Sequence, residues 1–193
     1  MQACHLKAEG LACRRGDRLL FAGLGFALDQ GEALQVTGAN GTGKSSLIRI
    51  VAGLLHAFEG AVHAKGAMGL VDERIALDEH QPLGKALSFW RRIDDCEFET
   101  TMDALGLTGL LDVPVRYLST GQRKRAALAR LIDQKAPIWL LDEPLNGLDS
   151  DAAMLVENLA EAHCKSGGIC LIASHQAFDL PGKRELALGE FAP

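Results

Sequence analysis

The chain has 193 residues, 48% of them hydrophobic and 23% charged, which is long enough to bury a core and typical of a globular protein rather than a disordered one. The formal net charge of −5 argues against nucleic acid as a partner, because nucleic-acid binding needs an extended basic surface. No apolar run approaches the roughly 18 residues that cross a bilayer, so we expect no direct membrane span.

The first third of the chain predicts strands and one helix. Residues 18–28 and 32–38 are short apolar runs bounded by turn residues, which is typical of strands. Residues 43–55 carry apolar side chains at helical spacing and predict a helix. Strand character returns over residues 59–71, where we expect the turn at Gly60.

The rest of the chain predicts an α/β fold. Between residues 72 and 134 the apolar spacing becomes helical, most clearly over 120–134. Two near-continuous apolar runs, 137–144 and 167–175, then flank a helical segment at 151–164. Such runs are typical of parallel strands buried on both faces. We therefore predict a layered α/β fold with a parallel sheet, into which the helical middle is inserted.

Residues 38–46, GANGTGKSS, fit the phosphate-loop pattern G-x-x-x-x-G-K-[ST] and lie between a predicted strand and a predicted helix. The glycines let backbone N–H groups point at phosphate oxygens, and the helix N-terminus adds positive potential. We expect Lys44 to bind the β- and γ-phosphates of a nucleotide and the Ser45 hydroxyl to ligate Mg²⁺. The candidate nucleotide-binding residues are Gly38, Ala39, Asn40, Gly41, Thr42, Gly43, Lys44, Ser45 and Ser46.

Two adjacent carboxylates follow the apolar run IWLLDEP. Asp142 ends the predicted strand, beside the phosphate loop, where it is expected to bind Mg²⁺. Glu143 is expected to polarise the water that attacks the γ-phosphate. Two carboxylates beside a triphosphate favour hydrolysis over transfer to an organic acceptor.

The stretch LSTGQRKR, residues 118–125, has several interpretations. Taken alone it is a basic surface, a nucleic-acid contact or a capped surface helix, with Ser119 or Thr120 as the N-cap. Beside a phosphate loop, the exposed N–H groups at such a helix start favour an anion, and Gly121 lets it approach the backbone. We expect the three bases at 123–125 to form the solvated face of the helix.

Five motifs, found in order, together resemble those of the ATP-binding subunits of ABC transporters. GANGTGKSS is similar to their Walker A motif, LSTGQ to the LSGGQ signature with Thr120 in place of the first glycine, and IWLLDEP to Walker B. LNGLD, which ends at Asp149, is similar to the D-loop, and His175 to the switch histidine. The resemblance covers essentially the whole chain. It implies one ABC-type ATPase domain over 1–193, with a mainly parallel sheet, an N-terminal antiparallel β part and a helical subdomain inserted at roughly 73–133.

The resemblance also implies a shared active site. In this family two domains face head to tail, so Ser119, Thr120, Gly121 and Gln122 would contact ATP held by the partner's Walker A motif. His175 would hold the γ-phosphate and the attacking water, and would act with Glu143 as a catalytic residue. The implied cofactors are ATP and Mg²⁺. The implied partners are a second copy, forming a homodimer, and integral membrane permease subunits.

The sequence departs from the general family pattern at two places. Where an aromatic residue usually stacks on adenine, Arg14 or Arg15 stands here, and a guanidinium plane can also stack on a ring. Where the Q-loop glutamine is usual, Asp72, Glu73 or Arg74 stands here.

A helical segment of the insertion is a candidate for docking a membrane subunit. It carries Leu87, Phe89 and Trp90, two of which we expect to belong to the core of the insertion instead.

The sequence around the motifs resembles that of one subgroup, the ATP-binding subunits of cytochrome c biogenesis haem exporters. The stretches that carry this resemblance are CRRGDRLLF, VPVRYLSTGQRKRAALARL, PIWLLDEPLNGLD and DLPGKRELAL. This implies a peripheral protein on the cytoplasmic face of the inner membrane, where ATP hydrolysis drives a haem-related step. Five cysteines without a C-x-x-C pair, which predict reduced thiols, agree with a cytoplasmic location. The alternatives are a subunit of another ABC transporter, a soluble ABC-type ATPase acting on nucleic acid or the ribosome, and a small-molecule kinase.

Overall fold

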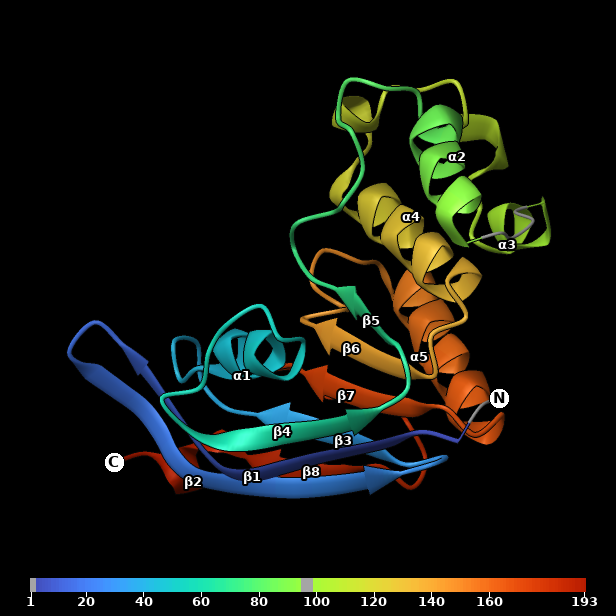
Figure 1. Cartoon of the computed structure of the whole chain (residues 1–193). Helices are drawn as coiled ribbons and strands as arrows, with labels where there is room; N and C mark the ends of the chain where they lie inside the picture. Colours follow the sequence, from blue (N-terminus) through green and yellow to red (C-terminus); the bar gives the residue numbers. More distant parts are fainter. Residues whose placement is uncertain (1–2, 95–98) are drawn as a thin grey trace.

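The computed structural model describes residues 3–94 and 99–193, which form two β-sheets with helices packed against them (Figure 1). The strands are β1 (His5–Arg15), β2 (Arg18–Asp29), β3 (Ala33–Thr37), β4 (Glu59–Lys65), β5 (Met68–Val71), β6 (Ile138–Asp142), β7 (Ile169–Ala173) and β8 (Arg184–Ala187). One sheet is antiparallel, with the strand order β2-β1-β4. The other is parallel, with the order β5-β6-β7-β3-β8. The predicted α/β class, with its antiparallel N-terminal part, is confirmed.

Both faces of the parallel sheet are covered, which explains the continuous apolar runs of its central strands. Every residue of β6 and β7 is buried. One face packs against helix α1 (Lys44–Val51) and the antiparallel sheet through a core that includes Phe21 and Leu47. The other face packs against α4 (Thr120–Asp133) and α5 (Ser150–Lys165) through Leu128 and Val156.

The chain between β5 and β6 is largely helical. It contains α2 (Leu83–Asp94), α3 (Glu99–Ala104) and α4, which share a separate hydrophobic core around Leu83, Leu105 and Ala126. In Figure 1, α2 and α3 lie away from the antiparallel sheet. Because β5 and β6 pair directly although these helices separate them in the sequence, we propose that roughly 73–133 is an inserted subdomain of a single domain over 1–193.

The turn expected at Gly60 lies elsewhere. Gly60 is inside β4, opposite an irregularity in β1, and its φ is 85°. A Cβ atom at this position would lie 2.4 Å from the Glu9 carbonyl oxygen, so the close approach of two strands explains the glycine. The turn between β4 and β5 instead includes Gly66, whose φ is 112°.

Two further elements differ from expectation. The helix predicted over 43–55 ends at Val51, because the chain turns at Gly53, whose φ is 73°. Strand β8 was not predicted, since it is short, lies at the edge of the sheet and is mostly exposed. Of the five cysteines, Cys4, Cys13, Cys164 and Cys170 are buried free thiols, and Cys96 lies outside the described residues.

Parallel order brings the carboxyl ends of β3, β6 and β7 to one edge of the sheet. The phosphate loop follows β3, the carboxylates end and follow β6, and His175 follows β7. Segments that are far apart in the sequence therefore meet at this edge, as ligand sites in open α/β sheets commonly do.

Candidate nucleotide-binding site

The phosphate loop connects β3 to α1 through a tightly curled backbone. Its glycines Gly38, Gly41 and Gly43 have φ values of 151°, 80° and 112°, which favour glycine over other residues. The Thr42 hydroxyl donates a hydrogen bond to the Ala39 carbonyl oxygen at 2.9 Å and closes the loop on itself. The loop is therefore curled by its glycines and closed by its own hydrogen bond.

The Lys44 side chain is buried inside this loop. Its Nζ atom donates hydrogen bonds to the carbonyl oxygens of Gly38 at 2.8 Å and Ala39 at 3.3 Å. It also forms an ion pair with Glu143 Oε1 at 3.4 Å. A preorganised ammonium group is thus available at the place where the phosphates of a nucleotide would bind.

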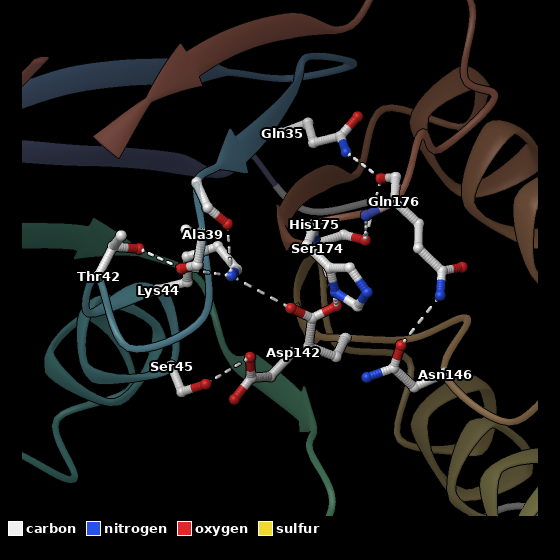
Figure 2. Close-up of polar contacts among 12 residues, drawn as sticks. Gln35, Ala39, Thr42, Lys44, Ser45, Asp142, Asn146, Ser174, His175 and Gln176 are labelled. Carbon is white, nitrogen blue, oxygen red and sulfur yellow. Dashed lines mark hydrogen bonds and ion pairs between the residues drawn. The ribbon is translucent and has the colours of Figure 1, made fainter. Parts of the chain in front are cut away.

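Ser45 and Asp142 form an oxygen-rich pair at the base of the site. The Ser45 hydroxyl donates to Asp142 Oδ1 at 3.0 Å, as Figure 2 shows. Burial raises the pKa of Asp142, and the Ser45 hydrogen bond partly opposes this effect. A hydroxyl and a carboxylate are oxygen ligands of the kind that Mg²⁺ prefers, so these residues fit a magnesium ion.

Glu143 has a left-handed backbone with a φ of 47°, which is uncommon for a residue other than glycine. Its N–H donates to the Ala173 carbonyl oxygen at 2.7 Å, which ties it to the end of β7. Its carboxylate lies between Lys44 and His175, whose Nδ1 atom is 2.8 Å from Glu143 Oε2. The two predicted catalytic residues are therefore in direct contact.

The loop after β7 is held by a hydrogen-bond network (Figure 2). The Gln176 carbonyl oxygen accepts bonds from Gln35 Nε2 at 2.7 Å and from the Ser174 hydroxyl at 3.0 Å. The Gln176 amide in turn donates to Asn146 Oδ1 at 3.2 Å, which links this loop to the loop after β6. The network fixes the backbone on both sides of His175.

An open cavity of about 450 Å³ joins these groups. Of the residues at the two positions that the sequence left open, Arg15 and Glu73 line this cavity, whereas Arg14, Asp72 and Arg74 do not. The Arg14 guanidinium instead lies 4.5 Å from the centre of the Phe58 ring. The other lining residues are Leu20, Asn40, Gly41, Gly43, Lys44, Ser45, Ser46, Glu143, Asn146 and His175. Leu20 lies outside the sequence motifs, and Asn146 lies within LNGLD without having been expected at the nucleotide.

The LSTGQ residues lie at a different hollow. Ser119 is the N-cap of α4, and it forms a capping box in which Ser119 Oγ accepts from the Gln122 N–H at 3.2 Å and the Gln122 side chain accepts from the Ser119 N–H at 2.8 Å. Asp149 is the N-cap of α5 and accepts from the Ala152 N–H at 2.8 Å. Ser119, Thr120, Gly121 and Asp149 line this hollow of about 330 Å³, which shares no lining residue with the Lys44 cavity.

Comparison with known proteins assigns the family. The sequence profile of the ABC transporter family matches residues 21–146, which is more than half of the chain. The chain belongs to the ABC transporter family.

Relatives match over the full length of this ABC transporter chain. The cytochrome c biogenesis ATP-binding export protein CcmA of Novosphingobium aromaticivorans is 56% identical, with 100% of both chains covered. The CcmA protein of Sphingopyxis alaskensis is 49% identical over 97% of this chain and 98% of its own. Among solved structures, an ABC transporter ATP-binding protein from Pyrococcus furiosus has a TM-score of 0.82 at 20% identity, covering 98% of this chain and 100% of that one, which confirms the fold. The chain is thus an ATP-binding ABC subunit with an ATPase domain.

The helical segment between β5 and β6 contains the three candidate docking residues. Of the three candidate docking residues, Leu87 is buried and Trp90 packs against the core, with its Nε1 atom donating to the Ala76 carbonyl oxygen at 2.7 Å. Phe89 is 53% exposed, so two of the three belong to the core, as predicted. No helix within residues 3–94 and 99–193 is long and apolar enough to cross a membrane.

The basic run after the signature is not a solvated face, contrary to expectation. Lys124 is only 6% exposed, and its Nζ atom donates to the Glu143 carbonyl oxygen. Arg123 donates to the Arg116 carbonyl oxygen at 2.7 Å and Arg125 to the Leu105 carbonyl oxygen at 3.1 Å. The expectation failed because segments outside this helix supply carbonyl acceptors for all three side chains.

Proposed function

We propose that this chain is the ATP-hydrolysing subunit of a transporter that powers a haem-related step in the maturation of c-type cytochromes. The proposal rests on one observation above all, the contact of Glu143 with both His175 and Lys44 in a cavity bounded by a phosphate loop. The haem-related role is supported by full-length relatives whose names place them in cytochrome c biogenesis.

The arrangement of charges suggests how the site responds to ATP. The Lys44 ammonium is paired with Glu143 at 3.4 Å. An incoming γ-phosphate competes for Lys44, which leaves the Glu143 carboxylate available to accept a proton from the attacking water. His175 then keeps the Glu143 carboxylate and the γ-phosphate in position relative to each other. Phosphoryl transfer of this kind depends mainly on positioning and on electrostatic stabilisation.

Mg²⁺ would be held by Ser45 and Asp142, which already lie 3.0 Å apart. When bound, it neutralises charge on the β- and γ-phosphates. As a ligand, the buried Asp142 carboxylate would be ionised, against the effect of burial on its pKa.

Glu73 is proposed to take the place of the Q-loop glutamine. It lines the cavity with Lys44 and Ser45, and a carboxylate at this position would add negative charge near the metal. Arg15 is proposed to stack on adenine, because it lines the same cavity while Arg14 is occupied by Phe58.

We further propose that the active form is a homodimer. Ser119, Thr120, Gly121 and Gln122 lie apart from the Lys44 cavity of their own chain, so a second copy in head-to-tail orientation would bring them to its ATP. The dimer would lie peripherally on the cytoplasmic face of the inner membrane, bound to integral membrane permease subunits.

The test uses Glu143→Gln, with Lys44→Ala as its matched control. Glu143→Gln is expected to bind ATP, to form a dimer in size-exclusion chromatography with ATP and Mg²⁺, and to hydrolyse ATP at least about 100-fold more slowly. Lys44→Ala is expected to bind no ATP and to remain a monomer. Full ATPase activity of Lys44→Ala would refute the assignment of residues 38–46 as the Walker A motif, and a Glu143→Gln that stays monomeric with ATP would refute the shared site.

The partner is tested by capture of tagged Glu143→Gln from native membranes with ATP. Recovery of haem-handling membrane proteins supports the proposed role. Recovery of an unrelated permease would support the ATPase mechanism but refute the haem-related role. Ribosomal or DNA-repair proteins without a membrane protein would refute the transporter role.

A further inference from the structure

Lys124 is a buried cation that the mechanism described above does not use. It lies in the second turn of α4, where its side chain is 6% exposed. Lysine is almost never buried to this extent without a specific partner. Its partner is the main-chain carbonyl oxygen of Glu143, which accepts a hydrogen bond from Lys124 Nζ.

The Glu143 backbone needs such support. A φ of 47° is unfavourable for a residue with a Cβ atom, and it persists only when neighbouring groups hold it. Three hydrogen bonds do so here. The Glu143 N–H donates to Ala173, the Asn146 N–H donates to the Glu143 carbonyl oxygen at 3.3 Å, and Lys124 donates to the same oxygen. Pro144 follows directly and has no N–H to contribute.

Of these three hydrogen bonds, the one from Lys124 has a charged donor. A hydrogen bond from an ammonium group is stronger than one from a neutral amide, and burial increases its strength further. Burial lowers the pKa of Lys124, whereas the nearby carboxylates of Glu143, Glu73 and Asp142 raise it, so the ammonium form has negative charges around it.

The same bond connects two functional segments of one chain. Helix α4 begins at the signature, with Ser119 as its N-cap, and Lys124 lies about one turn further along the helix. A movement of α4 when the signature contacts ATP would therefore reach Glu143 of the same chain through a single contact.

We propose that Lys124 is a positioning residue for ATP hydrolysis, which holds the Glu143 carbonyl so that the left-handed turn directs the carboxylate into the cavity. This inference rests on the proposed function, because it assigns Lys124 a role through Glu143. It predicts an effect on turnover rather than on ATP affinity, since Lys124 does not line the Lys44 cavity.

The test compares Lys124→Met, which keeps the length of the side chain and removes the donor, with Lys124→Arg, which keeps a charged donor. Lys135→Met is the matched control, because Lys135 is exposed and directly follows the C-cap of the same helix. Steady-state kinetics give kcat and KM, and equilibrium titration with a fluorescent ATP analogue gives Kd. Lys124→Met is expected to lower kcat about 10- to 100-fold with a Kd within about two-fold of the unaltered chain. Lys124→Arg should recover part of kcat, and Lys135→Met should leave it unchanged.

A second comparison separates positioning from a general structural role. Lys124→Met is introduced into Glu143→Gln, and the slow hydrolysis of both proteins is measured with radiolabelled ATP. If Lys124 acts through Glu143, the added substitution lowers the residual rate by less than about three-fold, because the group that it positions is already gone. An equal fold-loss in both backgrounds, or an unchanged kcat in Lys124→Met, overturns the proposal.

Two controls keep the test decisive. If Lys124→Met does not fold, Lys124→Gln serves in its place, since its neutral donor is expected to give an intermediate kcat, and a kcat equal to that of the unaltered chain counts against the proposal. Absence of ATP hydrolysis by the unaltered chain would refute the proposed function itself, a result distinct from normal hydrolysis that Lys124→Met does not change.

Discussion

His163 is expected to make the stability of this protein depend on pH. It lies on α5, it is 6% exposed, and its ring stacks on Trp139 with the centroids 3.9 Å apart and an angle of 13° between the planes. Its Nε2 atom is 3.2 Å from the Pro137 carbonyl oxygen, which can only accept, so Nε2 carries the proton of the neutral ring. Burial lowers the pKa of His163 from 6.5 to about 4, against the smaller opposing effect of backbone hydrogen bonds.

The direction and the magnitude of this pH dependence follow from the pKa of His163. Because His163 has a lower pKa in the folded protein than in the unfolded chain, the unfolded chain binds the proton first and acid favours unfolding. The stabilisation is fully present above pH 6.5 and is lost as the pH falls toward 4. At about 1.4 kcal/mol per pH unit, the full loss is about 3 kcal/mol, of which about 2 kcal/mol falls between pH 8 and pH 5.

The assay is urea unfolding at pH 8 and pH 5 of the unaltered chain and of His163→Phe. Phenylalanine keeps a flat ring against Trp139 but takes up no proton. The difference in unfolding free energy between pH 8 and pH 5 should be about 2 kcal/mol larger for the unaltered chain. Taking the difference between the two proteins removes the contributions of other titrating groups, including Asp142. Equal pH dependence in the two proteins would show that the His163 pKa is not lowered.

Three further predictions use matched pairs or single changes. Arg15→Ala is expected to raise the Kd for ATP about five-fold in a binding titration, whereas Arg14→Ala should leave it within two-fold, and equal effects would reject adenine stacking on Arg15. Gly60→Ala should lower the unfolding free energy by about 3 kcal/mol in urea, because of its φ and the close Glu9 carbonyl, against about 1 kcal/mol for Gly53→Ala, which has open space around it. Ser45→Ala should raise the Mg²⁺ concentration for half-maximal ATPase activity about ten-fold, and an unchanged Mg²⁺ titration would contradict its role as a ligand.

The sequence was most informative where the chemistry depends on neighbours along the chain. The curl of the phosphate loop needs glycines at fixed spacing before a helix, and GANGTGKSS supplies them locally. The capping box of Ser119 and Gln122 likewise depends on only four consecutive residues. The two central strands were also predictable, because burial on both faces demands the continuous apolar runs that end at Asp142 and Ala173.

Only the tertiary structure decided which side chains face each other across segments. Arg14 and Arg15 are adjacent and chemically identical, yet one contacts Phe58 and the other lines the cavity, since neighbouring residues of a strand point to opposite faces. The basic run predicts a solvated Lys124, whereas the fold places the Glu143 carbonyl oxygen beside its ammonium group. Whether a charged residue on a helix meets water or a buried acceptor depends on segments remote in the sequence, and helical periodicity carries no information about them.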